Sequence, residues 1–292
     1  MHTFTCFGEV LWDVFPDHEK IGGAPLNVAL RLKSFDDNVA MISAVGKDSL
    51  GKKLISFLYE NKLTTEFIQV KEEHETGKVN VTLDSKGSAS YEIKYPVAWD
   101  FIGLNEANIQ LVEESRVFIY GSLICRNIAS KHTLLGLLKH ANFKVFDVNL
   151  RVPFYSFELL KELMGQADFV KFNDEELELI AENLNSGHTS IEDNVAFIAK
   201  TFDVEHICVT RGGDGAILWM DGQFYYNSGY PVIVKDTVGA GDSFLASLVY
   251  KITGNDHPQN ALDFACVVGA LVAGSEGANP IISKSDIVKM MS

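Results

Sequence analysis

The fold is decided by one stretch of the chain, which reads Lys235-Asp236-Thr237-Val238-Gly239-Ala240-Gly241-Asp242-Ser243-Phe244. Two glycines around an alanine let the backbone approach a ligand closely, and the helix expected to begin near Gly241 offers free N–H groups to an anion. Asp242 places a carboxylate on the first helical turn, where the helix dipole favours the ionised form. The stretch therefore predicts a phosphate-binding turn beside a general base for an acceptor hydroxyl. In the alternative, which is common, the glycines only form a turn and Asp242 only caps the helix.

Outward from this stretch, the chain alternates short apolar runs with segments of helical period. The runs suit buried strands at residues 39–45, 116–120, 144–148 and 206–210, whereas helical spacing follows Asp48 and dominates residues 241–252 and 261–273. This alternation predicts an α/β fold with a three-layer, mostly parallel sheet flanked by helices. Because no repeat or linker divides the chain, we expect a single domain over residues 1–292.

Residues 78–95 break the pattern, because apolar and polar side chains alternate strictly on both sides of a turn at residues 85–88. Such alternation predicts a β-hairpin with one apolar face, formed by Val79, Val81, Leu83, Ala89, Tyr91 and Ile93. An apolar sheet face needs a cover, so we expect a lid over a ligand, inserted at about residues 11–23 and 67–100. Alternatively, the two strands only extend the central sheet at its edge.

Composition excludes several classes of function. Lys and Arg number 25 against 39 Asp and Glu, and the resulting net charge of −14 disfavours a nucleic-acid partner. The four cysteines contain no C-x-x-C pair, which fits a reducing cytoplasm and argues against a zinc or disulfide framework. The sequence begins without the pattern of a signal peptide, and its longest apolar run, residues 264–275, is shorter than the roughly 18 residues of a membrane helix. We therefore expect a soluble, cytoplasmic protein with no membrane partner.

A second glycine turn reads Gly22-Gly23-Ala24-Pro25-Leu26-Asn27 and leads into another expected helix. Asn27 can donate and accept hydrogen bonds to a polyhydroxylated ligand. Upstream, we expect Asp13 just past the carboxyl end of the first strand, on the usual ligand side of an open α/β sheet. Taken singly, such residues more often cap a loop or satisfy nearby backbone.

Together and in this order, these residues resemble the ribokinase-like (PfkB) family of sugar kinases over essentially the whole chain. The resemblance implies that Asp13 and the Gly22, Gly23 and Asn27 segment hold the sugar. It also implies that the backbone of Gly239, Ala240 and Gly241 forms an anion hole for the nucleotide and that Asp242, in contact with the sugar, is the catalytic base.

Further segments resemble the remaining motifs of the family. Residues 147–151 resemble its D-x-N-x-R segment, which implies that Arg151 lies near the sugar or the transferring phosphoryl group. Residues 173–176 resemble its N-x-x-E motif, which implies a nucleotide contact from Asn173 and a water-mediated Mg²⁺ contact from Glu176. Residues 209–216 resemble its nucleotide loop, T-x-G-x-x-G, which implies contacts from Thr210, Gly212 and Gly215.

Two more resemblances concern the turn after residue 45 and a cation. Gly46, Asp48 and Gly51 fail as a phosphate-binding P-loop, because Lys53 stands where a Ser or Thr is required, but they match the family's G-x-D-x-x-G turn. Residues 273–280 resemble the loop that binds a monovalent cation together with the Asp236 region. The resemblance thus implies ATP and Mg²⁺ as cofactors, and potassium as a further candidate.

Within the family, the segment after Gly22 and the opening Gly-Glu-x-x-x-Asp look most like fructokinases, which implies phosphorylation of fructose. Alternatives are a kinase for ribose or 2-keto-3-deoxygluconate, and a catalytically silent sugar sensor. An NAD-dependent oxidoreductase fits poorly, because the first strand is not followed by G-x-G-x-x-G. In many relatives two lids pack face to face, so we also expect a homodimer formed through the hairpins.

Overall fold

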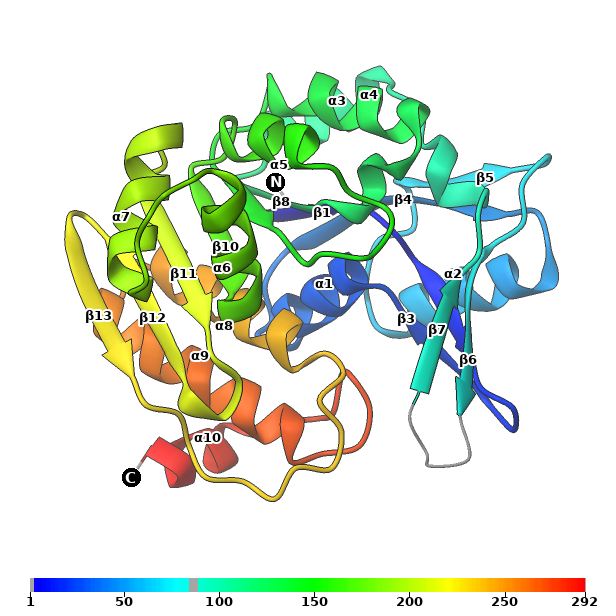
Figure 1. The fold of residues 1–292 in the computed structure, drawn as a ribbon. Helices are drawn as coiled ribbons and strands as arrows, with labels where there is room; N and C mark the ends of the chain where they lie inside the picture. The colour runs from blue at the N-terminus through cyan, green and yellow to red at the C-terminus, as the bar shows by residue number, and fades with distance from the viewer. Residues whose placement is uncertain (1–2, 84–88, 292) are drawn as a thin grey trace. The chain divides into compact units, whose positions relative to one another are not determined.

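The computed structural model describes residues 3–83 and 89–291, which divide into two compact units (Figure 1). Unit 1 contains Met1–Lys33 and Asp37–Asn142, and unit 2 contains Ser34–Asp36 and Phe143–Ser292. In each unit a mostly parallel group of strands packs with helices, so the predicted α/β class is confirmed.

Unit 1 contains four parallel strands in the order β8-β1-β4-β5. Their bounds are β1 (Phe4–Phe7), β4 (Val39–Gly46), β5 (Ile68–Lys71) and β8 (Val117–Gly121), and β4 and β8 confirm two predicted strands. The helical elements are α1 (Ala24–Ser34), α2 (Ser49–Glu60), η1 (Ala98–Phe101), α3 (Glu106–Glu114), η2 (Leu123–Arg126) and α4 (Ile128–Leu138). As the sequence predicts, Asp48 caps α2, where its side chain accepts a hydrogen bond from the Gly51 N–H.

Unit 1 also carries a separate four-stranded sheet, here called the small sheet, in the order β3-β2-β6-β7. Its strands are β2 (Leu11–Val14), β3 (Glu19–Gly22), β6 (Gly77–Leu83) and β7 (Ala89–Ile93). β6 and β7 are antiparallel, which confirms the predicted hairpin; its turn at residues 85–88 lies outside the described residues. The segment 67–100 assigned to the insertion also includes β5, which pairs with β4 of the larger sheet.

The apolar face of the hairpin is partly covered within the chain itself. Val79 is 6% exposed and Val81 is 2% exposed, and both pack with Leu11 while Phe15 and Ile93 lie against this cluster. For these two valines, no partner outside the chain is needed. The side chains of Leu83 and Tyr91 lie outside the described part.

The sequence predicts Asp13 just past the end of the first strand, and this placement is wrong. β1 ends at Phe7, and Asp13 lies inside β2, opposite Lys20 of β3 and Val79 of β6. The strand escapes prediction because it has only four residues and three of them are apolar, so its sequence shows no period-2 alternation.

Unit 2 contains three parallel strands followed by two antiparallel ones. They are β9 (Lys144–Asp147), β10 (Phe169–Asn173), β11 (His206–Thr210), β12 (Ala216–Met220) and β13 (Gln223–Asn227), in that order. The helices are α5 (Phe157–Met164), α6 (Asp174–Asn183), α7 (Ile191–Phe202), η3 (Gly212–Asp214), α8 (Ala240–Thr253), α9 (Pro258–Ala273) and α10 (Lys284–Met291). α6 and α7 pack on β10 and β11 from one side, and α8 and α9 lie on the opposite face (Figure 1).

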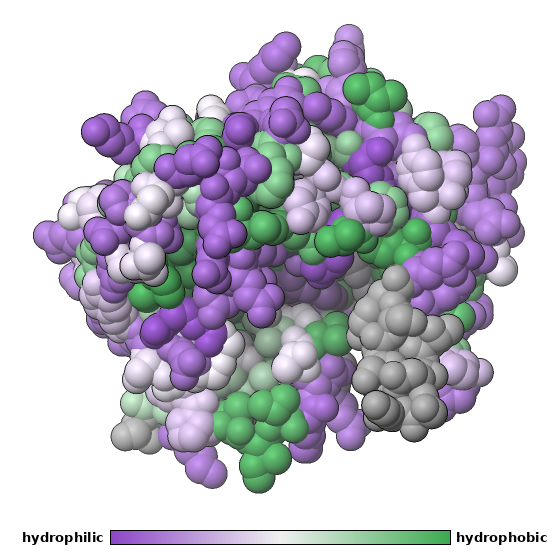
Figure 2. All heavy atoms as spheres, in the orientation of Figure 1, coloured by the Kyte–Doolittle hydropathy of each residue, from purple (hydrophilic) through white to green (hydrophobic). Residues whose placement is uncertain are grey.

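The helices predicted to begin near Gly241 and to cover residues 261–273 are α8 and α9, which pack on each other. α9 contains most of the longest apolar run of the sequence. Among the residues that the structure describes, no helix combines the length and apolar character needed to cross a membrane. The face drawn in Figure 2 is mostly hydrophilic, with apolar side chains scattered over it.

Candidate active site

The glycine turn that begins α8 has the geometry expected of a ligand-binding loop. Gly239 adopts φ +78°, in the left-handed region, and a Cβ atom there would lie 2.6 Å from Ala278 atoms, so only glycine fits. The Ala240 N–H donates to the Thr237 carbonyl oxygen at 3.2 Å, which closes the turn. Asp242 lies in the first turn of α8, as the sequence predicts.

A buried lysine, Lys171 on β10, lies against this turn. Its Nζ is 3.1 Å from Oδ1 of Asp147 on β9, the residue opposite it in the sheet, and both side chains are buried. A Cβ atom at Gly241 would lie 3.6 Å from the same Nζ. Burial lowers the pKa of Lys171, but the carboxylates of Asp147, Glu176 and Asp242 outweigh burial and raise it. The ammonium therefore stays charged beside the glycine turn.

Sequence reasoning missed Lys171, although a signal was present. The residue interrupts the apolar run Phe169-Val170-Lys171-Phe172, and a parallel strand with helices on both faces has no side open to water. A charge in such a strand requires a partner. Asp147, already singled out by the D-x-N-x-R segment, is that partner.

Asn173 and Glu176 form a reciprocal cap at the start of α6. Asn173 Oδ1 accepts from the Glu176 N–H at 2.7 Å, and Glu176 Oε2 accepts from the Asn173 N–H at 2.9 Å. Glu176 Oε1 accepts from the N–H of Leu150 at 2.8 Å, which fixes the segment after β9. Burial, together with the charge of Asp147, raises the pKa of Glu176. Lys171 and the two backbone N–H groups lower it, but they do not offset burial.

The T-x-G-x-x-G loop follows directly from β11. Thr210, its first residue, pairs with Asn173 across two parallel strands, so both lie at the carboxyl ends of neighbouring strands. Gly212 and Gly215 adopt φ values of +54° and +80°. A Cβ atom on Gly215 would strike the carbonyl oxygen of Asn227, so the loop packs closely on the segment after β13.

Asp236 ties together the two segments expected to bind a cation. Its Oδ1 accepts from the N–H of Val238 at 3.0 Å, and its Oδ2 accepts from the N–H of Gly277 at 3.2 Å. The N–H of Lys235 donates to the carbonyl oxygen of Ala273 at 2.9 Å. Arg151, by contrast, is exposed, and its guanidinium donates to the adjacent Leu150 carbonyl.

The predicted sugar-binding residues lie in unit 1. The Asp13 carboxylate faces Gly22, and a Cβ atom on Gly22 would come within 2.5 Å of Asp13 Oδ2. Gly23 has φ +116°, and a Cβ there would meet the Glu9 carbonyl oxygen at 2.5 Å. Asn27 is buried in the first turn of α1, where its N–H donates to the Gly23 carbonyl oxygen. The backbone conformation and packing thus require glycine at residue 23, whereas a side chain at residue 22 would displace the Asp13 carboxylate.

Asp13 lies in an apolar environment. The register places its side chain on the same face of the small sheet as Leu11, Val79 and Lys20. Burial raises the pKa of Asp13 to about 6, and the charge of Lys20 opposes this shift only in part.

The G-x-D-x-x-G turn has a structural role in unit 1. Asp48 Oδ2 accepts from the N–H of Thr76 at 2.8 Å, and Oδ1 accepts from the Thr76 hydroxyl at 2.7 Å. Burial raises the pKa of Asp48, but hydrogen bonds from Thr76 and Gly51 outweigh it and lower the pKa. Because Thr76 immediately precedes β6, the turn fixes where this strand of the small sheet begins.

The predicted residues lie in two units. The residues expected to bind sugar, here called the sugar set, are Asp13, Gly22, Gly23 and Asn27 in unit 1. The residues expected to bind the nucleotide phosphates, ions and the reacting hydroxyl, here called the phosphate set, are Asn173, Glu176, Thr210, Asp236, Asp242 and the glycine turn in unit 2, where the unpredicted Lys171 also lies.

Comparison with solved structures defines the class of protein. A double mutant of fructokinase from Vibrio cholerae, solved with fructose, ADP and a potassium ion, matches all of this chain and 99% of its own length with a TM-score of 0.85 and 24% identity, which shows the ribokinase-like fold. A sugar kinase of Pyrococcus horikoshii, solved with ATP, is 27% identical, with a TM-score of 0.83, over 99% of this chain and all of its own. The class is that of carbohydrate kinases.

The chain belongs to the family described as pfkB family carbohydrate kinase, which it matches over residues 4–285. Among curated relatives, fructokinase-2 of Solanum lycopersicum is 27% identical over 307 residues, covering 94% of this chain and 92% of the relative. The resemblance stated from the motifs is confirmed.

Proposed function

We propose that this carbohydrate kinase transfers the γ-phosphoryl group of ATP to a hydroxyl of fructose. The observation that carries the proposal is the start of α8, where Asp242 follows a left-handed glycine turn with the charged Lys171 at its side. Curated relatives named fructokinase and the Gly22-to-Asn27 segment support fructose as the acceptor.

In this mechanism Asp13 and Asn27 bind the hydroxyl groups of the sugar, and Asp242 takes the proton of the reacting hydroxyl. The sugar oxygen forms a bond to the γ-phosphorus as the bond between that phosphorus and the β,γ-bridging oxygen breaks, and ADP leaves. Backbone N–H groups of the Gly239–Gly241 turn stabilise charge on the transferring oxygens, and the Lys171 ammonium adds a fixed positive charge. Arg151, which is exposed, contributes a second cation.

The residues present fit a magnesium ion bound through water. Glu176 is a buried carboxylate whose oxygens each accept one backbone hydrogen bond, and each keeps a further lone pair for a water molecule. Among the described residues, no group of three or more Asp, Glu, His or Cys side chains is placed to hold a metal directly. The nucleotide phosphates and Glu176-bound water would hold the ion, which supplies charge neutralisation.

Asp236 and the 273–280 loop are our proposed monovalent-cation site. The support is that hydrogen bonds from both segments meet at one carboxylate, together with the potassium ion in the Vibrio cholerae relative. Activity that rises with potassium and not with sodium is the expected result.

We further propose that the chain acts as one cytoplasmic kinase domain whose small sheet is a lid that excludes water from the bound sugar. A homodimer through this sheet stays part of the proposal, although the cover found for Val79 and Val81 removes one reason for it.

The test is a coupled assay of ADP release with ATP, Mg²⁺ and a panel of acceptors: fructose, ribose, 2-keto-3-deoxygluconate, tagatose 6-phosphate and adenosine. The proposal expects kcat/KM to be highest with fructose. A higher value with ribose or with the sugar acid would assign the alternative acceptor, and binding of sugar without ADP release would establish a sensor.

A further inference from the structure

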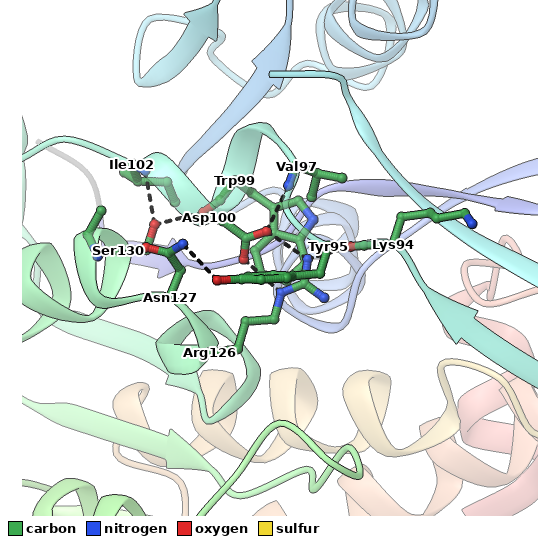
Figure 3. Close-up of polar contacts among 10 residues, drawn as sticks. Lys94, Tyr95, Val97, Trp99, Asp100, Ile102, Arg126, Asn127 and Ser130 are labelled. Atoms are coloured by element: carbon green, nitrogen blue, oxygen red, sulfur yellow. Dashed lines mark hydrogen bonds and ion pairs between the residues drawn. The ribbon is translucent and has the colours of Figure 1, made fainter. Parts of the chain in front are cut away.

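A buried charged cluster lies at the end of the small sheet where β6 begins and β7 ends, outside the sugar and phosphate sets (Figure 3). Arg126, at the end of η2, donates from Nε to Oδ1 of Asp100 at 2.7 Å and from Nη2 to Oδ2 at 2.8 Å. The two side chains are 1% and 0% exposed. Asp100 Oδ2 also accepts from the N–H of Val97 at 2.9 Å, so this carboxylate organises the turn of η1.

Two aromatic rings enclose the guanidinium of Arg126. Its Cζ atom is 3.8 Å from the ring centroid of Trp99 and 5.1 Å from that of Tyr95. Asn127 Nδ2 donates to the Tyr95 hydroxyl at 3.2 Å, and the Ser130 hydroxyl donates to the Trp99 carbonyl oxygen at 2.8 Å (Figure 3). Neighbouring residues thus anchor the hydroxyl of Tyr95 and the backbone of Trp99.

The cluster contacts the small sheet at two points. Arg126 Nη2 donates to the Lys94 carbonyl oxygen at 2.6 Å, just after β7, and the Lys94 N–H donates to the Lys78 carbonyl oxygen on β6 at 3.0 Å. At the second point the Trp99 ring lies against Gly77, the first residue of β6, where an added Cβ would come within 2.5 Å of Trp99 Nε1.

The Trp99 contact is on β6, the strand next to the one that carries Asp13, and the Arg126 contact, just after β7, reaches β6 through the hydrogen bond between Lys94 and Lys78. Gly77 lies opposite Leu11, and Lys78 lies opposite Trp12, the neighbours of Asp13 on β2. A strand shift of a few tenths of an ångström at β6 therefore moves the Asp13 side chain, because the hydrogen-bonded register couples the two strands.

We propose that Arg126 is a positioning residue for sugar binding: together with Trp99 it fixes the end of the small sheet and thereby the place of Asp13. The inference rests on the proposed function. Arg126 acts through the sheet and does not touch the sugar.

The test compares the KM for fructose and for ATP in Arg126→Lys, which keeps the charge but loses the two-pronged contact with Asp100. The inference expects fructose KM to rise about tenfold or more and ATP KM to stay within about twofold. Gly77→Ala disturbs the contact between β6 and the Trp99 ring without changing any charge. It therefore replaces Arg126→Lys in the test if that variant fails to fold. Leu137→Ala, in the buried face of α4, is the control for general loss of stability in unit 1.

A double-mutant cycle with Asp13→Asn separates positioning from plain structural support. If Arg126 acts through Asp13, Arg126→Lys adds less than about twofold to fructose KM in the Asp13→Asn background. The inference is overturned by an equal effect in both backgrounds, by an equal effect of Leu137→Ala, or by unchanged KM in folded Arg126→Lys and Gly77→Ala. If the wild-type chain releases no ADP with any acceptor, the proposed function fails first and the inference falls with it.

Discussion

Asp13 combines two properties that bear on pH dependence: it is placed to bind sugar, and burial raises its pKa to about 6. Lys20 is the charged group opposite it on β3, whereas the β6 neighbour is the apolar Val79. A carboxylate accepts hydrogen bonds from two hydroxyl groups, and protonation removes part of that capacity. Sugar binding should therefore weaken as the pH falls through about 6.

The measurement is the KM for fructose between pH 5 and pH 8. We expect KM to rise about tenfold from pH 7 to pH 5, because fructose itself does not titrate in this range. Asp13→Asn should have a high KM at every pH and lose this dependence. A pH-independent KM in the wild type would remove Asp13 from the sugar contacts.

Lys171 holds the buried carboxylates of unit 2 together, so its removal should affect both stability and turnover. Lys171→Met leaves Asp147 buried without its cation and should lower the free energy of unfolding by about 3–5 kcal/mol. The double variant Lys171→Met with Asp147→Asn should recover much of that loss. Its kcat should stay low, because the charge beside Gly241 is still missing.

Chemical denaturation and steady-state kinetics on the same three proteins test this prediction. Recovery of kcat along with stability in the double variant would show that Lys171 is only structural.

At the scale of elements, the hairpin of β6 and β7 allows a test of a charge introduced on its buried apolar face. Val81 is buried against its own chain, so Val81→Glu should destabilise the small sheet and raise the KM for fructose while calorimetry shows ATP binding retained. Val70→Glu is the matched control, because Val70 is 51% exposed on β5.

Sedimentation shows whether this apolar face packs only within the chain or also forms a dimer interface. If Val81 only packs within the chain, Val81→Glu leaves the sedimentation coefficient unchanged. Dissociation of a wild-type dimer by this single change would show that the face is also an interface.

The sequence predicts elements wherever periodicity extends over several residues. The buried strands β4, β8, β9 and β11, the hairpin, and the helices α2, α8 and α9 follow directly from the apolar pattern. The four-residue β2 has no such signal, and the place of Asp13 was wrong for that reason. Local pattern also cannot pair distant residues, so the partners of Lys171 and Arg126 appear only in the fold, 24 and 26 residues away.

For the whole molecule, we expect the two units to have separate tasks. Substitutions in the sugar set should change sugar binding alone, and substitutions in the phosphate set should change turnover. Asp242 is the residue that decides turnover, because in the proposed mechanism it accepts the proton of the reacting hydroxyl.

The most direct test is Asp242→Asn, assayed for fructose-dependent ADP release alongside calorimetric titration with fructose and with ATP. The amide keeps the size of the side chain and removes its charge. We predict that both ligands still bind with nearly unchanged affinity and that kcat falls by roughly 10²–10⁴-fold. A variant that keeps more than about a tenth of the wild-type kcat, with chemistry shown to limit turnover, would contradict the role of Asp242 as the general base.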